Sequence, residues 1–273
     1  MEKQRILITV KTYPQLSAKY GETVCTAGLR EDGSWIRLYP VPFRRLEEGQ
    51  QYSKYDWIEC RVQRRTKDHR PESYSPVDLS ELQPAGHLDT SANWRERRRL
   101  VLGSATVFDR MMPLIAAAHA NERSLAVFKP TKVLDWKVEE DDREWDPRKL
   151  ESMRQNTLQL ELFDDNSWRQ TFEVVRKVPW KFSYRFEDAD GRESTLQVLD
   201  WEAGALYWNC VRSSEGDESA ALRKVRQKYF DDFMKTNLHF FLGTIASFHS
   251  FAPNPWVIVG AFPVPHESQR DLF

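Results

Sequence analysis

The chain has 273 residues, of which 40% are hydrophobic and 30% are charged, and its formal net charge at pH 7 is −1. These values are typical of a globular protein with one large domain or two smaller ones. The near-zero charge excludes a protein that binds polyanions through its overall charge, so any nucleic-acid contact must use local basic patches. No apolar run is long enough to span a membrane, and we expect no membrane partner.

Three cysteines, Cys25, Cys60 and Cys210, lie far apart in the chain and form no Cys-x-x-Cys pair. This pattern favours neither a disulfide framework nor a zinc ribbon. We therefore expect reduced thiols, a cytoplasmic location, and no metal or cofactor.

Residues 22–45 predict a β-hairpin that turns at Asp32-Gly33, because glycine tolerates a positive φ. Arg37 lies between apolar residues of the second strand and is expected on the opposite strand face. Aromatic rings beside guanidinium groups suit the bases and phosphates of nucleic acid. The hairpin thus contributes five predicted contacts, Arg37, Tyr39, Phe43, Arg44 and Arg45. The alternative is a half-buried sheet with Trp35 in the core and the arginines in solvent.

Other elements of the first half follow from periodicity. Residues 5–10 predict a central strand, and residues 55–64 predict a strand with one buried face. Residues 66–93 show little periodicity and predict a long loop, while residues 104–121 predict a helix. A basic cluster begins within the predicted strand 55–64. It adds three predicted nucleic-acid contacts, Arg61, Arg64 and Arg65.

The second half resembles the first in kind. It contains predicted strands at residues 125–138, 171–187, 238–242 and 256–262, and predicted helices at 146–165 and 217–236. The segment around residue 182 alternates aromatic and basic side chains, which matches a surface for stacked bases. Its predicted contacts are Lys181, Tyr184 and Arg185. An aromatic stripe of this kind can equally form the core.

Three pairs of short blocks resemble the dual-OB-containing proteins, a bacterial family associated with nucleic-acid handling and conflict systems. They are residues 24–28 with 33–37, residues 181–184 with 200–202, and residues 241–244 with 255–260. The resemblance implies a strand-rich α+β fold with two OB-like modules, which are small β-barrels. A helix would join the modules, two or three helices would lie at their periphery, and the function would be binding rather than catalysis.

This organisation predicts four parts of the chain. An N-terminal module spans residues 1–145, a connector helix spans 146–165, a C-terminal module spans 166–262, and a flexible tail spans 263–273. We expect a non-catalytic nucleic-acid-binding accessory protein in bacterial DNA processing or anti-phage defence. Its partners would be DNA or RNA and a larger defence or repair complex.

An enzyme is the alternative, because Asp200 and Glu202 lie two residues apart at a predicted strand end. Paired carboxylates can bind a metal ion or transfer protons, as in a metal-dependent nuclease or a base-modifying enzyme. A nuclease would also need a nearby lysine, and the spacing of the sequence fixes none. The structural alternative is that the two acids pair with basic residues or cap a turn.

The last five residues resemble the peptide by which bacterial DNA-processing proteins bind the replicative sliding clamp. The predicted clamp contacts are Gln269, Asp271, Leu272 and Phe273. Prolines at residues 263 and 265 favour an extended tail that could present the terminal Leu-Phe pair to an apolar pocket. Residues 159–163 form a second, internal near-match.

Overall fold

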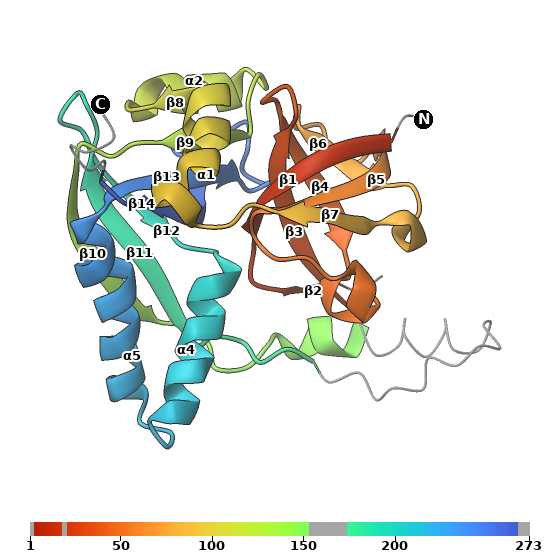
Figure 1. Cartoon of the computed structure of the whole chain (residues 1–273). Helices are drawn as coiled ribbons and strands as arrows, with labels where there is room; N and C mark the ends of the chain where they lie inside the picture. Colours follow the sequence, from red (N-terminus) through yellow and green to blue (C-terminus); the bar gives the residue numbers. More distant parts are fainter. Residues whose placement is uncertain (1–2, 18–20, 153–173, 267–273) are drawn as a thin grey trace.

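The computed structural model of the chain describes residues 3–17, 21–152 and 174–266. It has the predicted strand-rich α+β class, with two strand-built halves that lie side by side (Figure 1). Helices are more numerous than expected, and most of them pack on the second half.

The first half is a closed five-stranded barrel. Its strand order is β1-β3-β4-β6-β5, and β5 pairs again with β1 to close the ring. In chain order β4 and β6 are the third and fifth strands of this ring. These two run parallel, whereas the other neighbouring pairs are antiparallel. The strands are β1 (Lys3–Lys11), β3 (Gly21–Arg30), β4 (Trp35–Val41), β5 (Asp56–Arg64) and β6 (Ser73–Pro76), with β2 (Gln15–Ser17) on β3 and β7 (Gln83–His87) on β5.

The second half repeats the same strand order. Its first strand is divided into β9, which pairs with β13, and β10, which pairs with β11. Val198, just beyond β12, forms a parallel bridge with Ile258 of β14, so the third and fifth strands again meet in parallel. The strands are β9 (Leu125–Phe128), β10 (Lys132–Glu140), β11 (Trp180–Glu187), β12 (Glu193–Gln197), β13 (Asn237–Thr244) and β14 (Trp256–Val264). This order and the parallel contact are shared by the two OB-like halves.

Helices fill the connections between these strands. They are α1 (Ser91–Ser104), α2 (Met111–His119), α4 (Trp201–Ser213) and α5 (Glu218–Arg226), with the short β8 (Val107–Phe108) between α1 and α2. Of the helix predicted at 104–121, residues 111–119 are helical as α2, whereas α1 ends at residue 104 and β8 lies between the two. Asp217 caps α5 as its side chain accepts a hydrogen bond from the Ala220 N–H. The predicted helix 217–236 is confirmed, since a π-helical turn (Gln227–Asp232) and a 3-10 turn (Phe233–Lys235) continue it.

Three buried clusters hold the fold together. One fills the first barrel, and a second lies between the sheets and helices of the second half. The third cluster is shared by both halves, where Trp35 meets the Phe241 ring edge-on at a centroid distance of 6.0 Å. The side chain of Trp35 is 7% exposed, which confirms its predicted place in the core.

Strand pairing moves the expected boundary between the halves. We expected residues 1–145 to form one module, but β9 and β10 belong to the sheets of the second half. The predicted long loop at 66–93 contains β6 and β7, which are too short for their periodicity to reveal them. Of the predicted connector, residues 147–152 are helical, and its remainder lies outside the described residues.

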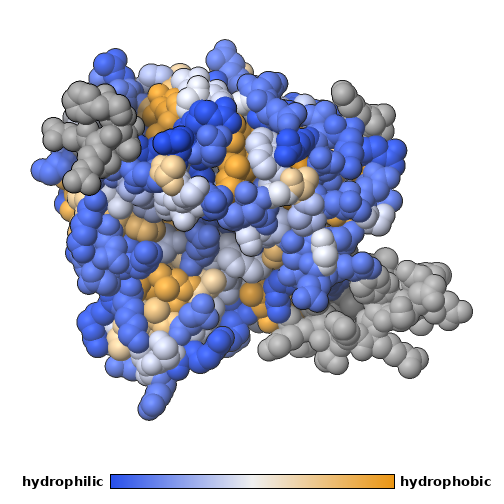
Figure 2. Space-filling model, viewed as in Figure 1, coloured by the Kyte–Doolittle hydropathy of each residue, from blue (hydrophilic) through white to orange (hydrophobic). Residues whose placement is uncertain are grey.

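The described residues contain no helix that is long and apolar enough to cross a membrane. Figure 2 shows a mostly hydrophilic face that is broken by small hydrophobic patches.

Candidate functional site

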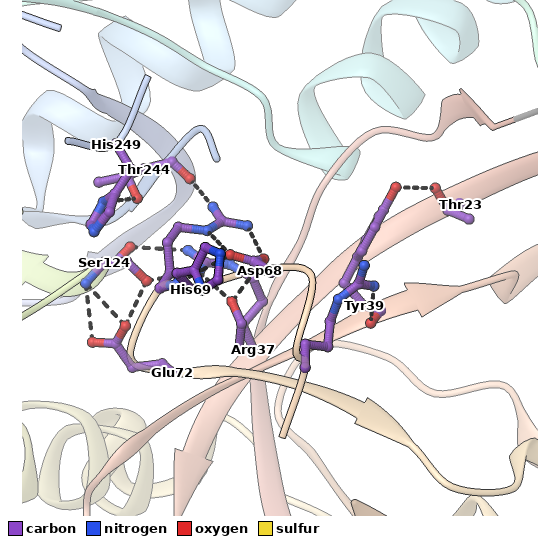
Figure 3. A network of polar contacts seen from close by, with 12 residues as sticks. Thr23, Arg37, Tyr39, Asp68, His69, Glu72, Ser124, Thr244 and His249 are labelled. Atoms are coloured by element: carbon purple, nitrogen blue, oxygen red, sulfur yellow. Dashed lines mark hydrogen bonds and ion pairs between the residues drawn. The ribbon is translucent and has the colours of Figure 1, made fainter. Parts of the chain in front are cut away.

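The loop between β5 and β6, residues 65–72, is fixed against the second half by a buried polar network (Figure 3). Asp68 accepts hydrogen bonds from the Arg70 Nε and from the Ser73 hydroxyl, each at 2.9 Å. Arg70 also donates to the backbone carbonyl of Thr244 at the end of β13. Burial alone would raise the pKa of Asp68, but the hydrogen bonds and charge of Arg70 outweigh it and hold this pKa well below its usual range. Asp68 is therefore ionised at neutral pH.

Arg37 lies inside this network, which corrects its predicted contact with nucleic acid. Its side chain is 2% exposed and donates to the Ser124 hydroxyl at 2.7 Å and to the Ser124 carbonyl at 3.0 Å. Glu72 accepts from the same hydroxyl at 2.5 Å. Arg37 does point away from the barrel interior, as the alternation of β4 predicts, but the second half covers that face.

Two further predicted contacts are also buried and need correction. Phe43 packs inside the first barrel, where its ring meets the Tyr52 ring at 4.9 Å. Tyr184 is 0% exposed, and its hydroxyl donates to the Tyr229 carbonyl. The aromatic stripe of β11 is thus core, because its side chains face the helices and β13 rather than solvent.

The remaining predicted contacts fall into two groups. The first group, Tyr39, Arg64 and Arg65, lies at the end of β5 and on a neighbouring strand. Lys67 of the β5–β6 loop and Tyr74 of β6 join it, and we call these five residues the basic loop surface. Within it the Arg65 guanidinium lies 4.9 Å from the centre of the Tyr39 ring and donates to the Tyr39 carbonyl at 2.7 Å. The guanidinium groups of Arg30 and Arg64 lie 4.9 and 5.5 Å from the Tyr74 ring.

No carboxylate of the described residues lies within ion-pair distance of Arg64, Arg65 or Lys67. Arg64 and Lys67 are exposed, and Arg65, Tyr39 and Tyr74 are half-buried. The surface therefore offers positive charge that no neighbouring acid neutralises, beside aromatic rings that packing holds in place.

The second group is dispersed, and most of its members already have acidic partners. Arg44 pairs with Glu22 at 2.8 Å, and Arg61 pairs with Glu81. On β11, Lys181 and Arg185 each have a carboxylate 3.2 Å away, and they lie on the outer face of the second half. Arg45 is half-buried beside Arg44. The structure therefore does not bring these residues together with the basic loop surface as one site.

Asp200 and Glu202 lie at the beginning of α4, a helix that the sequence did not predict. Asp200 is the N-cap residue of α4, and its carboxylate accepts a hydrogen bond from the Glu202 N–H at 3.3 Å. The Nζ of Lys54, in the turn before β5, lies 2.9 Å from Asp200 and 2.8 Å from Glu202. The side chains of Lys54 and Asp200 are 4% and 1% exposed, whereas that of Glu202 is 57% exposed. A cation from the first barrel thus already bridges both carboxylates.

Burial sets the electrostatics of this cluster. It raises the pKa of Asp200, and the charge of Lys54 opposes that rise. Burial would lower the pKa of Lys54, but the two carboxylates outweigh it and raise that pKa above its usual value. Lys54 is therefore charged at neutral pH.

Lys11 lies beside this cluster in a cage of aromatic rings. Its Nζ lies 4.0 Å from the centre of the Phe43 ring and 4.9 Å from that of Trp201, and it donates to the Tyr52 carbonyl at 3.2 Å. Burial is the largest cause that lowers the pKa of Lys11 to about 8, and the charge of Lys54 adds to it.

Comparison with known families assigns the chain to a family through its second half. Residues 107–273, more than half of the chain, match a family model described as a domain of unknown function, DUF8757. The chain belongs to this family. Residues 2–103 match a second model, also described as a domain of unknown function, DUF8758. No curated protein matches the chain.

The DUF8757 match begins at the first residue of β8, so it includes β9 and β10 together with the strands that pair with them. The two family models therefore divide the chain where the strand pairing does. Both carboxylates of the α4 cluster fall in DUF8757, whereas Lys54 falls in the DUF8758 match.

In the residues that it describes, the structure shows no site for two candidate functions, metal-dependent catalysis and binding to the sliding clamp. Among the residues that the structure describes, no three His, Cys, Asp or Glu side chains are grouped to hold a metal ion. The predicted clamp contacts Gln269, Asp271, Leu272 and Phe273, and the near-match at 159–163, lie outside the described residues.

Sequence reasoning missed Tyr74 and Lys54, whereas the density of basic residues between 61 and 70 indicated the local basic patch that contains Lys67. Tyr74 lies in the segment assigned to a loop, so no strand face was assigned to it. Lys54 is 146 residues from Asp200, and no spacing rule joins positions that far apart.

Proposed function

We propose that the chain binds nucleic acid through the basic loop surface, as a non-catalytic accessory to a larger DNA-processing or defence complex. The observation that carries the proposal is the grouping of Arg64, Arg65 and Lys67, which have no carboxylate partner among the described residues, beside the rings of Tyr39 and Tyr74. Phosphates would neutralise the cations, and the tyrosines would hold the guanidinium groups in place or stack on bases.

The position of this surface in the fold supports the proposal. OB-folds bind oligonucleotides on the face of their second and third strands and on two loops, one of which joins the fourth and fifth strands. In the first barrel the second and third strands are β3 and β4, and their outer face packs against the second half. The β5–β6 loop is the corresponding fourth-to-fifth connection, and it keeps its basic residues at the surface. The resemblance to the dual-OB-containing proteins points in the same direction.

No observation favours the enzyme alternative that uses Asp200 and Glu202. Lys54 lies within 3 Å of both carboxylates, and Asp200 caps a helix. Both roles are structural, because they stabilise the beginning of α4 against the first barrel.

Fluorescence anisotropy with a labelled oligonucleotide, titrated at several salt concentrations, tests the proposal. Three neutralised phosphates on a single strand give a log–log salt slope of about −2. The triple variant Arg64→Gln, Arg65→Gln and Lys67→Gln should bind more weakly and flatten this slope towards zero. Glutamine keeps a polar, uncharged side chain at these surface positions, so folding should be unaffected.

A matched control removes three exposed charges elsewhere, with Arg212→Gln, Arg223→Gln and Lys228→Gln on and after α4 and α5. It should bind as the wild type does. Equal losses in both triple variants, or no binding by the wild type at about 50 mM salt, would contradict the proposal.

A further inference from the structure

The loop between β13 and β14, residues 245–255, carries two exposed aromatic rings. Phe248 is 47% exposed and Phe251 is 71% exposed. In residues 3–17, 21–152 and 174–266 no other Phe, Trp or Tyr side chain is exposed; the rest are buried or half-buried. The two rings meet edge-on at a centroid distance of 6.1 Å, which leaves much of their surface in water. Exposure of this kind is unfavourable for a folded chain unless the rings serve as a contact surface.

Hydrogen bonds fix the shape of this loop. The Phe248 N–H donates to the Ile245 carbonyl, and the Ala252 N–H donates to the Phe248 carbonyl, both at 3.0 Å. From α2, the His119 Nε2 donates to the Ala252 carbonyl at 2.8 Å. The rings are therefore presented by an ordered turn, which lowers the entropy cost of binding.

A chain of directed hydrogen bonds joins this loop to the β5–β6 loop. The Asn121 amide donates to the His69 carbonyl at 3.1 Å, so its oxygen is free to accept from the His249 Nε2 at 3.0 Å. The other ring nitrogen, His249 Nδ1, lies 2.9 Å from the Thr244 hydroxyl and accepts from it. Burial, and then the charges of Arg70 and Arg37, lower the pKa of His249, in keeping with this neutral ring.

Asn121 itself is held at the end of α2 with φ +55°, a left-handed conformation that asparagine tolerates at helix ends. The Arg70 contact with the Thr244 carbonyl adds a second link between the loops. Phe248 directly precedes His249, and Lys67 comes two residues before His69. The loop that carries the exposed rings is thus held against the loop that carries Lys67.

We infer that these two loops form one composite site for single-stranded nucleic acid. The inference rests on the proposed function and names its substrate class. The cations of the β5–β6 loop bind the phosphates, and the rings of Phe248 and Phe251 stack on unpaired bases. Double-stranded nucleic acid keeps its bases stacked on one another, so their faces are closed to these rings, whereas a single strand can turn them outward.

The test compares the salt dependence of oligonucleotide binding in two kinds of variant. Phe248→Leu with Phe251→Leu keeps apolar side chains but removes the aromatic faces. It should weaken binding to a single-stranded oligonucleotide by about tenfold or more without changing the salt slope, because no charge is lost. Phe248→Tyr with Phe251→Tyr should retain binding. Met234→Leu, at an exposed apolar position on another element, is the control and should have no effect.

Separate results would overturn the inference and the proposed function. If the wild type binds single strands and the charge variants weaken binding, but the double leucine variant binds as the wild type does, the composite site is wrong and the basic loop surface stands. The same conclusion follows if a duplex of equal length binds as tightly as the single strand and responds equally to the leucine changes. If no oligonucleotide binds, the proposed function itself fails.

Discussion

Replacing Lys54 by methionine should destabilise the protein by about 3–5 kcal/mol, the usual cost of removing one partner of a buried ion pair. The cost arises at Asp200, whose side chain is 1% exposed and loses a cation 2.9 Å away. Glu202 adds little, because its side chain is 57% exposed and water can solvate it. Methionine fits the space left by the lysine stem, so a cavity contributes only a minor part.

The loss should depend on pH in a defined direction. Without Lys54, the pKa of Asp200 in the folded chain rises further above that in the unfolded chain. A carboxyl with a raised folded pKa stabilises the fold at pH values below its unfolded pKa, and this contribution is lost as the pH rises through the folded pKa. The deficit of Lys54→Met should therefore be largest near pH 7 and shrink as the pH falls towards 4.

Urea denaturation of wild type and variant at pH 7 and pH 4.5 measures both effects. The double variant Lys54→Met with Asp200→Asn should recover much of the loss, because asparagine is neutral and still caps a helix. Lys132→Met, at an exposed position of β10, should change the free energy of unfolding by less than about 0.5 kcal/mol. A Lys54→Met loss below about 1 kcal/mol, or one that does not change with pH, would refute this account of the cluster.

Two other substitutions test the core and the caged lysine. Trp35→Ala should lower the free energy of unfolding by about 3–5 kcal/mol in urea titrations, and an unchanged melting temperature would remove Trp35 from the core. Because the pKa of Lys11 is about 8 when folded and higher when unfolded, the folded chain loses this proton first and gains stability as the pH rises from 8 to 10. The gain from Lys11 should be about 2–3 kcal/mol, and urea titrations of Lys11→Met should lack it; parallel pH profiles for wild type and variant would contradict this.

Local patterns in the sequence predicted the individual elements well. Alternation correctly separated the inward aromatic side chains of β11 from Lys181 and Arg185 on its outer face. The Asp32-Gly33 turn is also confirmed, with a Gly33 φ of +79°. These features depend on residues a few positions apart, which the sequence displays directly.

Contacts between the halves could not be predicted in this way. Arg37 occupies the predicted face of β4, but that face meets Ser124, which is 87 residues away, and not solvent. Likewise, nothing near Phe248 in the sequence indicates that its loop touches the β5–β6 loop. The candidate site was therefore predicted in part: its basic residues were found, and its partner loop was not.

The two family models divide the sequence, but the two halves share a core and therefore do not fold as separate units. Cutting the chain between residues 103 and 107 would expose Trp35 on one fragment and Phe241 and Phe262 on the other. Each fragment would then carry an apolar face that favours self-association. In a calorimeter the intact chain should melt in a single transition, because neither half can lose its structure without opening the core of the other.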